Sequence, residues 1–153
     1  MQNYTKIINI MKELIWDNEL DITILANTSA LLYEMLPNIN WVGFYLFRNN
    51  LLLLGPFQGK PACTKIPLEK GVCGACATTL ATINVPDVHQ FKGHIACDSA
   101  SKSELCVPIL LHGRLYAILD IDSPSVHRFT LEDQKGIEQI RSILQKELEK
   151  IID

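Results

Sequence analysis

The hydrophobic positions near both ends of the chain recur at helical spacing. Residues 20–36 repeat apolar side chains every three or four positions, and Pro37 follows as a stop signal. Residues 5–16 also favour a helix. Near the C-terminus, Thr130 followed by an acid at Asp133 is typical of a helix start, and an apolar stripe continues beyond it. The pattern therefore predicts helices at both ends of the chain.

The centre of the chain predicts strands joined by tight turns. Residues 41–47 are aromatic and β-branched, and residues 51–54 follow the turn sequence Arg48-Asn49-Asn50. Residues 104–111 and 115–121 flank a second turn, His112-Gly113-Arg114. A short helix is expected over residues 71–81 and a short strand over residues 83–85. Hairpin-linked strands between terminal helices predict an α+β fold, in which helices cover an antiparallel sheet.

Composition and charge narrow the class of protein. A chain of 153 residues, 48% hydrophobic and 20% charged, is expected to form one globular domain over residues 1–153. The net charge is -3 and no basic stripe is present, so we expect no nucleic-acid partner. No stretch approaches the ~20 apolar residues of a membrane helix, and the first residues do not resemble a signal peptide. We therefore expect a cytoplasmic protein with no membrane partner.

The five cysteines suggest chemistry rather than a secreted disulfide framework, because a reducing compartment keeps most thiols free. Cys97 lies in a polar segment that contains glycine, within the long connection 87–102, and long loops of this kind are usually functional. Cys73 begins the predicted helix, where the helix dipole would favour a thiolate, and Cys63 lies in a predicted loop. Cys97 and Cys73 could instead be buried packing residues. Cys76 and Cys106 have apolar neighbours, and packing is the favoured role for both.

A metal site is the main alternative use of these thiols. Cys73, Cys76, His94 and Cys97 together have the ligand types of a zinc site. The alanines and threonines around Cys76 instead indicate a helix that continues into a core. We therefore expect no bound metal.

Acidic and aromatic residues could form a pocket beside the thiols. Asp120 and Asp122 are separated by one residue in a strand, so their side chains share one face. If the strands pair through the turn at 112–114, Glu104 lies beside them, and the three acids could hold an ammonium group and supply a proton. The alternative for the two aspartates is an ordinary solvated strand end. Trp41 and Tyr45 also share a strand face and could wall a pocket, and core packing is the alternative for them.

These motifs together resemble the free methionine-(R)-sulfoxide reductases, which are stand-alone GAF-domain enzymes. The resemblance rests on Gly93-His94-Ile95-Ala96-Cys97-Asp98-Ser99, on Leu119-Asp120-Ile121-Asp122-Ser123-Pro124, and on the spacing of Cys63, Cys73 and Cys97 by ten and then twenty-four residues. It extends from about residue 20 to residue 135 and implies a GAF fold. That fold has a six-stranded antiparallel sheet with helices on both sides, and the family is often dimeric through terminal helices.

The resemblance also implies roles for individual residues. Cys97 would be the nucleophile, Cys63 the main resolving cysteine and Cys73 an auxiliary redox thiol. Trp41 and Tyr45 would be pocket walls, and the substrate-binding and acid residues would be Glu104, Asp120 and Asp122. The substrate would be free methionine-(R)-sulfoxide, with no bound cofactor, and thioredoxin would reduce the disulfide of a protein expected to be a homodimer.

Two further interpretations stay open at this point. The chain could be a non-catalytic GAF module that senses a small ligand, because fold alone does not fix function. It could also be a zinc-stabilised redox regulatory domain. The resemblance leaves the roles of Cys76 and Cys106 open.

Overall fold

The computed structural model describes residues 3–93 and 100–153. Cys97 and His94 lie outside these residues. The helices are α1 (Tyr4–Ile15), α2 (Asp21–Met35), α3 (Gly71–Thr79) and α4 (Leu131–Glu149), with a short 3-10 helix, η1 (Val88–Gln90). The strands are β1 (Trp41–Arg48), β2 (Leu51–Gly59), β3 (Lys65–Pro67), β4 (Ile83–Val85), β5 (Ser103–Leu111) and β6 (Arg114–Ser123). Among these, no helix is long and apolar enough to span a membrane.

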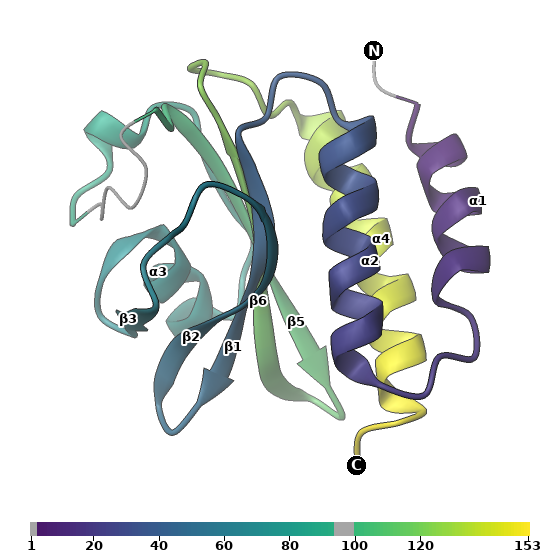
Figure 1. Ribbon diagram of the computed structural model, residues 1–153. Coiled ribbons are helices and arrows are strands. Elements are labelled where there is room, and N and C mark those ends of the chain that lie inside the picture. Colours follow the sequence, from purple (N-terminus) through teal and green to yellow (C-terminus); the bar gives the residue numbers. More distant parts are fainter. Residues whose placement is uncertain (1–2, 94–99) are drawn as a thin grey trace.

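Within the described residues, the strands form one six-stranded sheet in the order β3-β2-β1-β6-β5-β4, and every neighbouring pair is antiparallel. Figure 1 shows α1, α2 and α4 on one side of this sheet and α3 on the other. The expected α+β fold with helices on both sides is therefore confirmed.

Each face of the sheet buries its own apolar cluster, because strand side chains alternate between the two faces. Val42 and Phe44 of β1 and Leu105 of β5 pack against α1, α2 and α4. Trp41 and Tyr45 of β1 face the opposite side, where they pack with Cys73 and Cys76 of α3. The candidate chemistry therefore lies on the α3 side of the sheet, away from the larger core.

The two β-hairpins close through residues that tolerate a left-handed backbone. Asn49 and Asn50 have φ of 51° and 59°, and His112 and Gly113 have φ of 51° and 78°. Positive φ at both central residues is typical of the tight turns that match strand twist. The second turn is thus His112-Gly113 alone, because Arg114 already belongs to β6.

Two strands differ from the sequence prediction. β2 continues past Leu54 to Gly59, although Pro56 removes a backbone donor within it. The short edge strand β3 was not expected, since three residues carry too little pattern to be recognised. At the start of α4 the expected cap is present: the Thr130 side chain accepts from the Asp133 N–H, and Asp133 accepts from the Thr130 N–H.

Candidate active site

The acids of β5 and β6 lie beside the aromatic residues of β1 because of the strand register. Asp122 pairs with Trp41 on one side and with Glu104 on the other. Two residues earlier in β6, on the same face, Asp120 pairs with Gly43 and with Cys106. We call Glu104, Asp120 and Asp122 the acid cluster. This register confirms the expectation that the three acids share one face of the sheet, at the same end of the hairpin.

Burial makes the acid cluster electrostatically unusual. Asp120 is only 5% exposed, and Glu104 is also buried. Burial and the nearby charges of Asp122, Cys73 and Glu104 raise the pKa of Asp120 well above its usual range. A carboxyl group of this kind holds a proton that it can donate, and the cluster attracts a cationic group.

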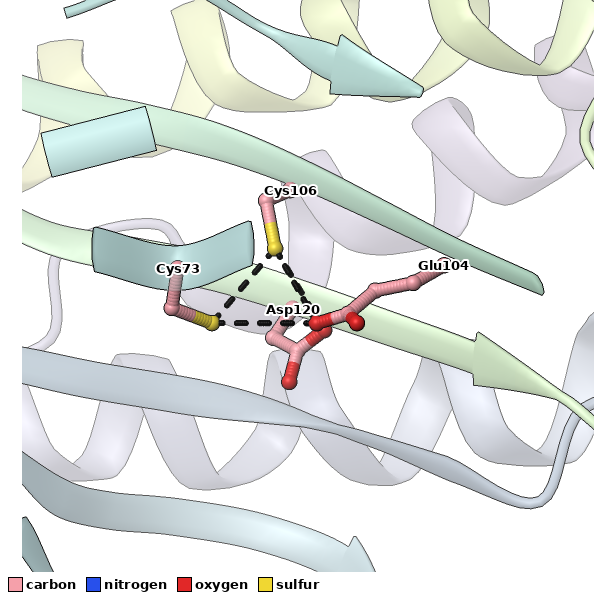
Figure 2. A group of neighbouring side chains, drawn as sticks. All are labelled: Cys73, Glu104, Cys106 and Asp120. Carbon is pink, nitrogen blue, oxygen red and sulfur yellow. Dashed lines mark hydrogen bonds between the residues drawn. The ribbon is translucent and has the colours of Figure 1, made fainter. Parts of the chain in front are cut away.

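Two thiols lie against the acid cluster (Figure 2). The Cys73 and Cys106 sulfur atoms are 3.4 Å apart. The Cys106 Sγ is also 3.4 Å from Glu104 Oε2 and 3.6 Å from Asp120 Oδ1, and the Cys73 Sγ is 3.8 Å from Glu104 Oε2. All four residues are buried, and their ligand-type atoms lie within 4.8 Å of one another, so this group could hold a metal ion.

The pKa of Cys73, at the start of α3, differs from the sequence prediction. The hydrogen bond with Cys106 favours a Cys73 thiolate, but burial and the charges of Glu104 and Asp122 outweigh it, so the pKa of Cys73 is raised. The helix dipole was expected to lower it. The overall shift of the Cys73 pKa is opposite to that expectation, because burial of the thiol, together with the nearby negative charges, outweighs the partial charge of a helix end.

Cys106 is the site residue that sequence reasoning missed. Its apolar neighbours in the chain, Leu105 and Val107, face the helix-covered core, and its own side chain points to the other face. Packing alone is therefore an incomplete account of Cys106. The signal available in the sequence was its position two residues after Glu104 in the same predicted strand, which places both side chains on one face. Cys76, by contrast, is fully buried in the apolar cluster under α3, and the expected packing role fits it.

Cys63 lies in the predicted loop, between β2 and β3, and is half-buried. It is disulfide-bonded, whereas Cys73, Cys76 and Cys106 are free thiols. The Tyr45 hydroxyl donates to the Cys63 carbonyl oxygen over 2.9 Å. The Trp41 indole N–H donates to the Lys60 carbonyl oxygen over 3.1 Å. The two expected pocket residues therefore anchor the loop that carries Cys63.

The aromatic residues form a continuous stack beside the acids. The rings of Trp41 and Tyr45 are 5.9 Å apart between centroids, and Phe57 stacks on Trp41 at 5.2 Å. Gly43 makes this possible, because a Cβ at that position would collide with the Cβ of Phe57. The stack gives the acid cluster an apolar wall with polar edges.

A separate cavity of about 610 Å³ lies on the other side of the sheet. Its lining residues come from the start of α1, from the segment between α2 and β1, and from the start of α4 with the residues just before it: Tyr4, Pro37, Arg128, Thr130, Leu131, Glu132 and Asp133. At this cavity the Asp133 carboxylate already accepts hydrogen bonds from the side chains of Tyr4, Arg128 and Thr130. This cavity does not contain the candidate chemistry.

Comparisons with known proteins show the family of this chain. The family model described as "GAF domain" matches residues 22–144. The "Free methionine-R-sulfoxide reductase" of Escherichia coli is 52% identical over 124 residues, which cover 81% of this chain and 75% of the relative. The structure of fRMsr of Staphylococcus aureus in complex with substrate is 50% identical, with a TM-score of 0.93 over 97% of both chains. The free methionine-R-sulfoxide reductase of Neisseria meningitidis, also with its substrate, is 38% identical, with a TM-score of 0.93 over 97% of this chain and 89% of that one.

Proposed function

Because the chain belongs to the GAF-domain family of free methionine-R-sulfoxide reductases, we propose that it reduces free L-methionine-(R)-sulfoxide to methionine. The observation that carries the proposal is the buried acid cluster beside the stack of Trp41 and Tyr45, with the loop of Cys63 anchored to that stack. This arrangement offers anionic partners for an amino group and an apolar wall for a methionine side chain.

In the proposed reaction, the Cys97 thiolate attacks the sulfur of the sulfoxide. The sulfoxide oxygen takes up a proton and is transferred to the Cys97 sulfur as the bond between Cys97 and the substrate sulfur breaks. The substrate sulfur gains two electrons from Cys97, methionine leaves, and Cys97 is left as a sulfenic acid. The thiol of Cys63 then condenses with the sulfenic acid, forming a disulfide and releasing water. The dithiol of thioredoxin reduces this disulfide by exchange and returns both thiols.

The state of the cysteines supports the roles proposed for them. Cys63 is in a disulfide, as a resolving cysteine is at the end of the reaction. Cys73, Cys76 and Cys106 are free thiols. The pairing of Cys63 with Cys97 is part of the proposal, since Cys97 lies outside the described residues. Cys73 is assigned an auxiliary role because burial disfavours its thiolate.

The acid cluster is proposed to bind the substrate and to supply the proton. Asp120 and Asp122 would hold the ammonium group of the free amino acid, and Glu104 or Asp122 would protonate the departing oxygen. A pocket that binds the free ammonium group through these carboxylates would exclude a methionine within a polypeptide, whose amino group is in a peptide bond. No bound cofactor is needed for these steps.

We also propose a homodimer that works in the cytoplasm. Large apolar side chains are exposed along α1, α2 and their connection, including Ile10, Leu14, Trp16, Leu20, Ile22 and Tyr33. Exposed apolar surface of this kind marks interaction sites, and a second copy of this chain is the proposed partner. The free thiols fit a reducing compartment.

The decisive experiment is a thioredoxin-coupled assay of NADPH oxidation with each epimer of free methionine sulfoxide. We expect turnover with the R epimer and none with the S epimer or with peptide-bound sulfoxide. Cys97→Ser should abolish methionine formation. Cys63→Ser should still form one methionine per chain but fail to turn over with thioredoxin. Cys76→Ala, at a thiol outside the site, is the matched control that should keep both phases.

A wild-type protein that consumes neither epimer contradicts the proposal. Binding of methionine sulfoxide without its reduction would instead favour the sensor interpretation. Should Cys63→Ser turn over at the wild-type rate, Cys63 is not the main resolving cysteine.

A further inference from the structure

The thiols of Cys73 and Cys106 and the carboxyl groups of Glu104 and Asp120 form a compact group, with one ligand-type atom from each within 4.8 Å of the others. Glu104 and Cys106 project from one face of β5, Asp120 from the neighbouring position on β6, and Cys73 from the first turn of α3 above them (Figure 2). The family resemblance assigns no role to Cys106. We call these four residues the thiol–carboxylate cluster.

The distances within the cluster match the geometry of a zinc site. In a tetrahedral zinc site with Zn–S bonds of about 2.3 Å and Zn–O bonds of about 2.1 Å, the two sulfur atoms are about 3.8 Å apart. Each sulfur is then about 3.6 Å from each ligand oxygen. The observed S···S distance is 3.4 Å, and the S···O distances are 3.4, 3.6 and 3.8 Å. Small side-chain adjustments would therefore admit the ion without moving the sheet.

From this geometry we propose that the reduced protein binds one thiophilic divalent cation, of the zinc class, through Cys73 Sγ, Cys106 Sγ, Glu104 and Asp120. Two sulfur donors exclude magnesium and calcium, which take oxygen ligands at higher coordination number. All four side chains are buried, so the site keeps water from the ligands.

The charges of the four groups also favour a bound cation. Deprotonated, the four groups repel one another in a buried site, and each then needs a compensating positive charge. In the metal-free protein, protons supply it. A divalent cation can take the place of those protons, with their release into solution.

Binding of the cation would regulate the reductase site, and this part rests on the proposed function. Glu104 and Asp120 cannot coordinate the ion and receive the amino group and oxygen of the sulfoxide at the same time. The metal-bound form is therefore inactive, and removal of the ion by a chelator restores turnover. Oxidation of the cluster thiols to a disulfide would also remove two ligands, so the site exists only in the reduced protein.

The binding test uses reduced full-length protein, Co²⁺ as a spectroscopic probe and no sulfoxide. We expect one Co²⁺ per chain, with the strong visible bands of a tetrahedral site, a sulfur-to-cobalt charge-transfer band, and displacement of both by one equivalent of Zn²⁺. An excess of Mg²⁺ should not displace it.

Two variants locate the ion. Cys106→Ala and Cys76→Ala make the same change at two thiols that are both fully buried. We expect Cys106→Ala to lose the charge-transfer band and to weaken Zn²⁺ binding by at least about tenfold, whereas Cys76→Ala keeps the wild-type spectrum. Thermal unfolding of both variants checks that they are folded. Cys63→Ser should also keep the spectrum.

The proposal is overturned if the wild type shows no tetrahedral spectrum. It is equally overturned if the spectrum survives Cys106→Ala, or disappears in Cys63→Ser, since the ion then sits on other thiols. Zn²⁺ inhibition of sulfoxide reduction, reversed by chelator, is measured separately. A protein that binds cobalt as described but reduces no sulfoxide would contradict the proposed function and leave this inference intact.

Discussion

The two sides of the sheet each bury an aspartate to nearly the same extent, but in opposite surroundings. Asp133, on the side of α1, α2 and α4, is 4% exposed, and Asp120, on the α3 side, is 5% exposed. Asp133 accepts from the Tyr4 hydroxyl at 2.7 Å, the Thr130 N–H at 2.8 Å and the Arg128 guanidinium at 3.0 Å. Asp120 has acids and thiols as neighbours.

The difference separates a structural carboxylate from one suited to chemistry. Burial raises the pKa of Asp133, but its hydrogen bonds from Thr130 and Tyr4 and the charge of Arg128 outweigh burial and lower it overall. At Asp120, burial and neighbouring negative charge act in the same direction, so its pKa is raised. A fully paired carboxylate stabilises the fold, whereas one among like charges is ready to bind a cation or to share a proton.

The largest effect that tests this contrast is expected from Asp120→Asn. The amide keeps the shape of the protonated acid but cannot bind an ammonium group as an anion, so kcat/KM should fall by about 100-fold. The unfolding temperature should not fall, because the change removes a source of repulsion. Coupled NADPH oxidation and thermal unfolding measure the two quantities. A variant with full activity and lower stability would reverse the comparison.

The next effect is expected from Asp133→Asn. Loss of the charged cap and of the bond to Arg128 should lower the free energy of unfolding by about 2 kcal/mol at neutral pH. The folded variant should keep kcat/KM, because Asp133 lies on the opposite side of the sheet from the acid cluster. Urea unfolding and the coupled assay test both parts. Loss of activity without loss of stability would contradict the structural role.

The pH dependence of stability should distinguish the same variant from the wild type. The folded pKa of Asp133 is lowered, so its contribution is fully present above the unfolded value, about pH 3.9, and is lost as the pH falls through the folded value. We therefore expect the stability gap between wild type and Asp133→Asn to close in acid. Urea midpoints over a pH series measure it. A gap that stays constant to the lowest pH would mean that the charge of Asp133 is not the cause.

The smallest effect is expected from Tyr45→Phe, which removes the hydrogen bond to the Cys63 carbonyl and keeps the ring. The free energy of unfolding should fall by about 1 kcal/mol. Because the lost bond anchors the loop of Cys63, thioredoxin-dependent turnover should slow more than the formation of methionine in a single turnover. Quenched single-turnover and steady-state assays separate the two. Equal slowing of both phases would place Tyr45 in substrate binding alone.

The sequence was informative where local chemistry decides structure. The helical periodicity of residues 20–36, the asparagine turn after Arg48 and the cap at Thr130 each depend on neighbours within a few positions, and each prediction is confirmed. The family was recognised from motifs that span the chain, and the comparisons confirm it. The roles of the individual site residues stay predictions.

The register of the acid cluster depended on a detail that the sequence did not reveal. The turn holds two residues, His112 and Gly113, and an unbroken ladder from it would pair Glu104 with Ile121, on the face of the helix-covered core. A bulge between Ile109 and Leu110 shifts the ladder by one residue, so that Glu104 pairs with Asp122. Since a shift of one residue exchanges the two faces of a strand, this bulge brings Glu104 to the acids.

The sequence by itself determined the elements, the family and the residue types available for chemistry, because propensities, turn residues and motif spacing are properties of short segments. Only the tertiary structure decided which charges each buried aspartate meets and that Cys106 joins Cys73 beside Glu104 and Asp120. Those contacts join α3, β5 and β6 across many residues of chain. Their electrostatic effect depends on burial and on distances of a few ångströms, which packing alone fixes.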